Sequence, residues 1–287
     1  MKIGRFHIEQ LSEGFFEIHS RGKICKVDPE WMTRTTPEES EKHPFHRIGI
    51  DPILVTDGHH IILVDPGLGW GLDHRSKWHN TSNVVTNLEI FDIQPDQVNF
   101  VILTHLHYDH SAGCSYVDSS LKTCPTFPNA TYMVQREEWE YALTLQAEKA
   151  VSDDSGGEYR LDELYKLVAE ERVHFIEQKE TELIPGVALI RTGGHTPGHQ
   201  VVRITDGARE AWCPGDLIPS ELNLNRGALN RYHTDPVSAS KFKGSILEEA
   251  CRNQSWLLFY HSMFQKTGRL ALDKKRNYIL LEEARNR

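Results

Sequence analysis

Residues 105–110, with the sequence HLHYDH, hold four side chains that can bind metal ions. Imidazole suits zinc and neighbouring transition metals, and a carboxylate adds charge and can accept a proton. The preceding segment VNFVILT is apolar and β-branched, which predicts a buried strand. Alternation along that strand places His105 and His107 on one side, while Asp109 and His110 lie on the turn that follows. One short segment can therefore serve two metal ions, and a polar turn with surface histidines is the weaker interpretation.

Further ligands must come from elsewhere, because six residues cannot complete two coordination shells. Three later residues each end an apolar run: His195 in GGHTPGH, Asp216 in WCPGD and His261 in WLLFYH. Taken singly, each is explained equally well as an ordinary polar residue at a strand end. Together with residues 105–110 they provide seven ligand-type side chains.

The segments between these residues predict strands and helices in two similar halves. Two apolar runs flank the turn signal Asp57-Gly58 and predict a β-hairpin. The runs ATYMVQ, VHFIE, GVALIRTGG, HQVVRITDG and EAWCPGD predict further strands. Residues 81–94 suggest a helix, and Thr234-Asp235-Pro236 is typical of the start of another, which runs to about Asn253.

No interdomain linker is visible, so one domain over residues 1–287 is expected. Residues 21–50 lack a clear period and predict a long loop or lid. Residues 135–172 predict a helical insertion, with helical spacing at 136–150 and 158–171 and a break at Gly156-Gly157. Both halves end apolar strands in ligand-type residues, which indicates a site where strand ends meet.

The motifs HLHYDH, GGHTPGH, PGD and FYH, in that order, resemble the metallo-β-lactamase superfamily, and Asp65 in LVDPGLG matches its first motif. The resemblance covers about residues 50–265. It implies an α+β fold, a four-layered αβ/βα sandwich of two mixed sheets packed face to face with helices outside.

The resemblance also implies roles for the ligand-type residues. They divide between two ions and a bridge: His105, His107 and His195 for the first ion, Asp109, His110 and His261 for the second, and Asp216 between them. Asp65 is implied to hydrogen-bond a ligand or the neighbouring backbone. His199 is implied to be structural and not a ligand.

The implied chemistry is metal-dependent hydrolysis. Two divalent ions, zinc by preference with iron or manganese as alternatives, lower the pKa of a bridging water so that hydroxide exists near neutral pH. That hydroxide attacks an ester-like carbonyl, and the metals stabilise the oxyanion. Asp109 is expected to orient the hydroxide and to carry its proton to the leaving group. No GxSxG nucleophile motif is present.

Within the superfamily, the chain resembles the N-acyl homoserine lactonase-like group and its organophosphate-hydrolysing relatives. The segments HLHYDHSAG, PTFPNATYMVQREEWEYA and ICKVDPEWMTRTTPEE carry this likeness, which implies a lactone substrate. Some lactonases have a tyrosine three residues after the bridging aspartate, where this chain has Pro219. Tyr108 or Tyr232 could supply a hydroxyl instead, although packing explains either ring.

Softer expectations concern the substrate. An apolar wall over the metals is expected from three residues of the early loop: Trp31, Met32 and Phe45. Packing of that loop against the rest of the domain is an equal alternative.

Other functions than lactone hydrolysis stay open. Phosphotriesterase and aryl-esterase activities are the first alternatives. A non-catalytic binding protein is disfavoured, because all seven ligand-type residues are present. A glutathione thiolesterase would use basic residues near the C-terminus, and Lys274–Arg276 are interpreted as a solvated helix face.

Composition limits the partners. The chain has 32 Lys and Arg against 41 Asp and Glu, a net charge of −9, which argues against nucleic acid and anionic membranes. No apolar run approaches a membrane span, and the N-terminus lacks a signal-peptide pattern, so a cytoplasmic location is expected. The five cysteines show no CxxC spacing and are expected to be free thiols, with a Cys114–Cys124 bridge left open. A homodimer is also left open.

Overall fold

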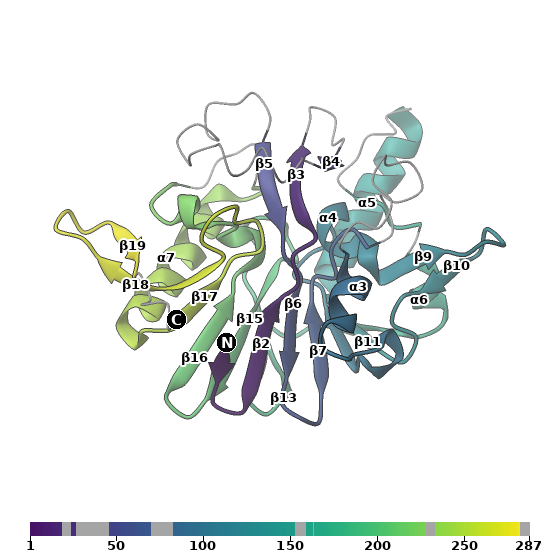
Figure 1. The fold of residues 1–287 in the computed structure, drawn as a ribbon. Coiled ribbons are helices and arrows are strands. Elements are labelled where there is room, and N and C mark those ends of the chain that lie inside the picture. The colour runs from purple at the N-terminus through teal and green to yellow at the C-terminus, as the bar shows by residue number, and fades with distance from the viewer. Residues whose placement is uncertain are drawn as a thin grey trace.

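Two large β-sheets face each other in the computed structural model of the chain (Figure 1). The structure describes residues 1–18, 24–26, 46–69, 83–152, 159–162, 164–227 and 233–281. No helix in these ranges is both long enough and apolar enough to cross a membrane.

The first sheet combines an antiparallel and a parallel half. Its strand order is β1-β2-β6-β7-β8-β11-β12, and β7, β8, β11 and β12 run parallel. The predicted hairpin at Asp57-Gly58 is confirmed, since it joins β6 to β7. The strands are β1 (Lys2–Ile3), β2 (Phe6–Gln10), β6 (Ile53–Thr56), β7 (Ile61–Val64), β8 (Phe100–Ile102), β11 (Thr131–Gln135) and β12 (Val173–Ile176).

The second sheet is antiparallel except for one pair. Strands β16 and β17 are parallel, so both end at the same edge of the sheet. The strands, in sheet order, are β13 (Glu180–Ile184), β14 (Val187–Arg191), β15 (Gln200–Asp206), β16 (Arg209–Cys213), β17 (Trp256–Leu258), β18 (Thr267–Leu272) and β19 (Tyr278–Leu280).

Apolar side chains from both sheets form the core between them. Ile8, Val55 and Ile62 of the first sheet belong to one buried cluster with Leu189 and Ile204 of the second. Burial of such side chains stabilises the fold by about 1.5–3 kcal/mol each.

The helices cover the outer faces (Figure 1). Helices α3 (Val84–Glu89), α5 (Arg136–Ser152) and α6 (Tyr165–Ala169) pack on the first sheet, and α7 (Pro236–Asn253) packs on the second. The order helix, sheet, sheet, helix confirms the four-layered αβ/βα sandwich.

The expected loop at 21–50 is partly wrong. Strands β3 (Gly14–Ile18), β4 (Ile24–Lys26) and β5 (His46–Ile50) form a small sheet in the order β4-β3-β5. These short strands lack a clear alternation of polar and apolar residues, and their pairing is set by contacts distant in sequence. Trp31, Met32 and Phe45 lie outside the described residues.

Local sequence signals predicted the last long helix correctly but not the segment at Lys274–Arg276. Helix α7 begins as predicted, with Asp235 accepting hydrogen bonds from the amides of Val237 and Ser238, and ends at Asn253. The expected C-terminal helix face at Lys274–Arg276 is wrong, because these residues form the turn between β18 and β19. The Gly156-Gly157 break lies outside the described residues.

A second hairpin directly follows Cys114 and contains Cys124. Strands β9 (Ser115–Val117) and β10 (Thr123–Pro125) pair with each other away from the large sheets. Cys114 and Cys124 at this hairpin form no disulfide with each other, and Cys213 and Cys251 form none either. These four cysteines are therefore thiols, as their spacing predicted.

Candidate metal centre

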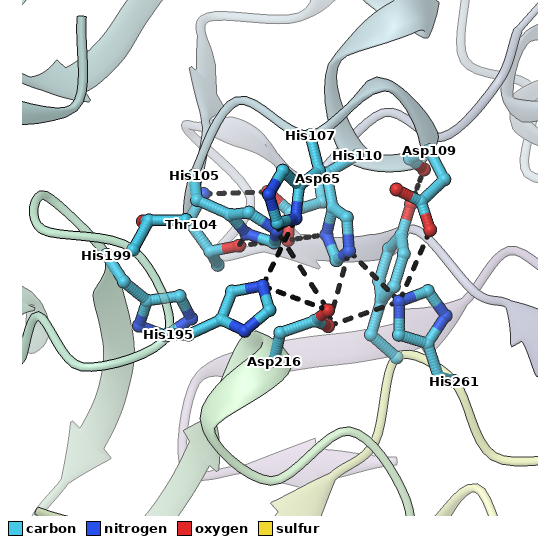
Figure 2. A network of polar contacts seen from close by, with 12 residues as sticks. Asp65, Thr104, His105, His107, Asp109, His110, His195, His199, Asp216 and His261 are labelled. Carbon is cyan, nitrogen blue, oxygen red and sulfur yellow. Dashed lines mark hydrogen bonds and ion pairs between the residues drawn. The ribbon is translucent and has the colours of Figure 1, made fainter. Parts of the chain in front are cut away.

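The seven ligand-type side chains come together at one edge of the sandwich (Figure 2). Four of them lie in a span of six residues that follows strand β8, and the other three follow strands β14, β16 and β17. The sites are His105 and His107 in the turn after β8, Asp109 and His110 on α4 (Tyr108–Ser111), His195 between β14 and β15, Asp216 on η3 (Gly215–Leu217), and His261 after β17. Asp109 and His110 thus lie on a short helix and not on an open turn.

One group of ligand atoms is built around His107. Its Nδ1 lies 2.9 Å from His105 Nε2 and 3.1 Å from His195 Nε2. Zinc binds imidazole nitrogen at about 2.0–2.1 Å, so nitrogens around one tetrahedral ion lie about 3.3 Å apart. The spacing of the three nitrogens therefore fits ligands that share one ion.

The second group contains Asp109, His110 and His261. The Nε2 atoms of the two histidines are 3.0 Å apart, and Asp109 Oδ2 lies 3.6 Å from His261 Nε2. Mixed imidazole and carboxylate ligands suit zinc, iron or manganese. This donor set also fits a divalent cation.

Asp216 lies between the two groups, with one carboxylate oxygen toward each (Figure 2). Its Oδ2 is 3.4 Å from His195 Nε2 and 4.0 Å from His105 Nε2. Its Oδ1 is 3.3 Å from His110 Nε2 and 3.1 Å from His261 Nε2. One side chain therefore serves both groups.

Burial and charge make the two groups electrostatically different. Burial and the neighbouring histidines hold the pKa of His105 well below its usual value, and burial does the same for the pKa of His195. Neutral imidazole is the form that binds metals. Burial opposes protonation of His110 and His261 as well, but Asp216 and the other carboxylates beside them together outweigh it and raise both pKa values. Positive charge is thus favoured beside Asp216, where a metal ion would replace the protons.

Asp65 fixes the orientation of His110. Its Oδ2 accepts a hydrogen bond from His110 Nδ1 at 2.9 Å, so His110 directs Nε2 toward Asp216. The same carboxylate accepts from the Thr104 amide at 2.7 Å and from its hydroxyl at 2.6 Å. Asp65 therefore contacts both a ligand-type residue and the neighbouring backbone, where the resemblance implied one or the other.

Two neighbours of the second group, Tyr260 and Gly49, were given no role by sequence reasoning. Tyr260 stacks on His110 with ring centroids 4.2 Å apart, and its hydroxyl donates to the Asp109 carbonyl at 2.8 Å. His261 Nδ1 donates to the carbonyl of Gly49 on β5 at 2.8 Å, which leaves Nε2 facing the group. The small sheet thus helps to orient His261.

His199 is fully buried and belongs to neither group of ligand atoms. Its Nδ1 lies 2.9 Å from the Thr192 hydroxyl, and its Nε2 faces the turn at Gly215. A Cβ on Gly215, where φ is +51°, would lie 2.9 Å from that Nε2. His199 packs against the turn that carries Asp216.

The burial of His199 predicts acid sensitivity of the metal-free protein. Burial lowers its pKa to about 3, whereas an unfolded histidine titrates near 6.5. Between these values the unfolded state binds a proton that the folded state does not, so stability falls as the pH falls. His199→Asn, which retains a group able to reach Thr192, should remove about 1.4 kcal/mol per pH unit of this loss. Urea titrations with chelator from pH 6 to 4 measure the difference, and equal slopes in both proteins would contradict it.

The remaining site candidates are placed only in part. Tyr108 packs in a buried cluster with Phe16, Ile50 and Tyr260, and the Arg160 guanidinium lies 4.2 Å from its ring centroid. This is the packing alternative for Tyr108, and a catalytic role for its hydroxyl stays a prediction. Tyr232 lies outside the described residues.

The fold and the paired ligand groups define a protein of the metal-binding αβ/βα class. The model of the metallo-beta-lactamase superfamily matches residues 49–246, more than half of the chain. The chain therefore belongs to the metallo-beta-lactamase superfamily.

Curated relatives match part of the chain. An N-acyl homoserine lactonase from Bacillus cereus is 28% identical over 157 residues, which are 50% of this chain and 53% of that protein. An N-acyl homoserine lactonase AttM from Azorhizobium caulinodans is 32% identical over 142 residues, 45% of this chain and 48% of that protein. The chain thus spans about half the length of these curated relatives.

Solved structures match nearly the whole chain. The dizinc quorum-quenching lactonase AidC, in complex with a product, has a TM-score of 0.71 at 18% identity, covering 99% of this chain and 97% of that one. Hydrolase AbOPH of the beta lactamase superfamily has a TM-score of 0.74 at 23% identity, covering 99% and 96%. These similarities establish the fold.

Proposed function

We propose that this protein is a dinuclear metal-dependent hydrolase that opens a lactone ring or a similar ester. The observation that carries the proposal is the position of Asp216, whose two oxygens face two separate groups of ligand-type residues. The first ion would be held by His105, His107 and His195, the second by Asp109, His110 and His261, with Asp216 shared. When bound, two divalent cations supply a water of lowered pKa and polarise the substrate carbonyl.

The protein's own contribution is position and proton transfer. Asp109 is only partly buried, with 14% of its side chain exposed, so a substrate or a water molecule can reach it. Its backbone is held by the Tyr260 hydroxyl, which limits its movement. Asp109 is therefore suited to orient the attacking water and to transfer a proton to the leaving oxygen.

A lactone substrate is favoured by the names of the curated relatives, which are N-acyl homoserine lactonases. The match covers about half the length of each relative, so the assignment of a lactone substrate rests on partial similarity. Trp31, Met32 and Phe45 remain candidates for contacts with an acyl chain, and Tyr232 remains a candidate for the carbonyl.

A phosphotriesterase or aryl-esterase activity is the second candidate, and Pro219 supports it. This residue stands where some lactonases have a tyrosine, and its carbonyl accepts a hydrogen bond from the His261 amide at 2.9 Å. No side-chain hydroxyl is available at this position beside the second group. The carbonyl of a substrate must then be bound by other groups than in those lactonases.

A substrate panel separates these functions. Fully metallated protein should hydrolyse N-acyl homoserine lactones with kcat/KM rising with acyl-chain length, because each buried methylene contributes about 0.8 kcal/mol. The panel also contains simple lactones, aryl esters and phosphotriesters, measured against chelator-treated protein. Turnover of phosphotriesters or aryl esters without lactones would replace the lactone assignment. A metallated protein that turns over none of them would instead support a binding protein.

A further inference from the structure

Glu138 is a fully buried carboxylate that accepts four hydrogen bonds. It lies in the first turn of α5, on the outer face of the first sheet. A buried charge is costly unless it is hydrogen-bonded, so an acidic residue with four donors indicates a specific role for the carboxylate.

The two oxygens of Glu138 reach two different ligand-bearing loops. Oε1 accepts from the amide of Leu106, between His105 and His107, at 3.0 Å. Oε2 accepts from the hydroxyl of Thr196, next to His195, at 2.6 Å and from the amide of Gly198 at 3.2 Å. All three loop ligands of the first group are therefore adjacent to residues that Glu138 holds.

Two further contacts tighten this arrangement. The Tyr159 hydroxyl donates to Oε1 at 3.1 Å, and the Tyr159 ring packs edge-on against His107 at 4.9 Å between centroids. Gly198 approaches the start of α5 so closely that a Cβ there would lie 2.2 Å from the Glu138 backbone nitrogen. Helix α5 and the loop of His195 are thus in direct contact.

Within the described residues, the hydrogen bonds of Glu138 go to the loops of the first group and to Tyr159, whereas the second group has its own support in Asp65, which accepts a hydrogen bond from His110. We infer that Glu138 is the positioning residue of the first metal group alone, holding the loops of His107 and His195 at the spacing that one ion requires. This inference rests on the proposed dinuclear function. Partners that orient metal ligands typically change metal affinity by about 10–100-fold when they are replaced.

The test uses Glu138→Gln, which keeps the shape of the side chain and one acceptor oxygen. Its amide nitrogen cannot accept a hydrogen bond, so the backbone amide of either Leu106 or Gly198 loses its acceptor and one of the two loops is held less firmly. The matched control is Glu140→Gln, an exposed glutamate on the same helix. Affinity for Zn²⁺ is measured by chelator competition, with near-ultraviolet circular dichroism as the check on folding.

Two ligand variants provide the backgrounds that assign the effect to one group. In His261→Ala the tighter remaining ion is held by the first group, and Glu138→Gln should weaken it by about 10–100-fold. In His195→Ala the remaining ion is held by the second group, and Glu138→Gln should leave its affinity unchanged. Equal weakening in both backgrounds, or none in either, overturns this inference and leaves the proposed function intact. Wild-type protein that binds no Zn²⁺ overturns the proposed function and the inference with it.

Discussion

Asp216→Ala is expected to lose both metal ions and nearly all hydrolytic activity. The two oxygens of this carboxylate face different groups at 3.1–3.4 Å from their nearest histidine nitrogens, so its removal takes a negative ligand from each. The fall in kcat/KM should exceed the roughly 10²–10³-fold cost of losing a single oxyanion stabiliser, since both sources of that stabilisation are lost. Elemental analysis after dialysis gives the metal count, and substrate turnover gives the rate.

Asp206→Asn is the matched control for this experiment. Asp206 ends β15 and bonds to Arg5 near the N-terminus, so the change removes a carboxylate without touching the ligand groups. It should keep two ions and wild-type turnover. An Asp216→Ala protein that retains one ion at wild-type affinity would contradict a shared role for this residue.

Asp109→Asn should reduce kcat by about 10²-fold in fully metallated protein, the typical effect of losing a general acid–base group. Asparagine retains an oxygen that can bind a metal, but it cannot take up and release the transferred proton. The measurement compares kcat across a series of pH values at saturating metal, so that weaker metal binding does not enter the result.

The control for Asp109 is Asp96→Asn, at an exposed carboxylate on the surface. It should leave both kcat and its pH dependence unchanged. If a metallated Asp109→Asn enzyme kept near wild-type turnover, Asp109 would serve only as a ligand and the proton would move by another route.

The ligand-type residues were predictable because residue type, spacing and strand ends all point to the same chemistry. His105 and His107 follow an apolar strand, and that strand is buried in the sheet. The start of α7 was also predictable, since Asp235 and Pro236 act locally and need no distant partner. Structure that depends on interactions within a few residues can therefore be predicted from the sequence.

Contacts between distant segments could not be predicted in the same way. In the run REEWEYA, Glu138 is indistinguishable from the exposed Glu137 and Glu140, because only the fold brings Thr196 and Leu106 to it. Likewise Tyr260 was hidden within an apolar strand end, and its stacking on His110 depends on how the two sheets meet. The strand β5 was missed because its partner β3 lies almost thirty residues earlier in the chain.

The C-terminal turn illustrates a further limit. Lys274–Arg276 were interpreted as helical from their charge, yet Asp273 accepts hydrogen bonds from the amides of Lys275 and Asn277 and closes a turn. Asp side chains that bond to the backbone two residues on are typical of turns. Asp273 therefore indicated a turn, but the run of charged residues after it was given more weight.

The parallel pairing of β16 with β17 brings Asp216 and His261 to the same edge as the turn after β8. Each proposed ion would then draw ligands from both sheets, and neither half of the chain could assemble a complete shell alone. The ions would act as cross-links between the two halves, so the energy of binding them also resists separation of the sheets. For such a protein, the concentration of available metal would determine the lifetime of the folded chain as well as the rate of catalysis.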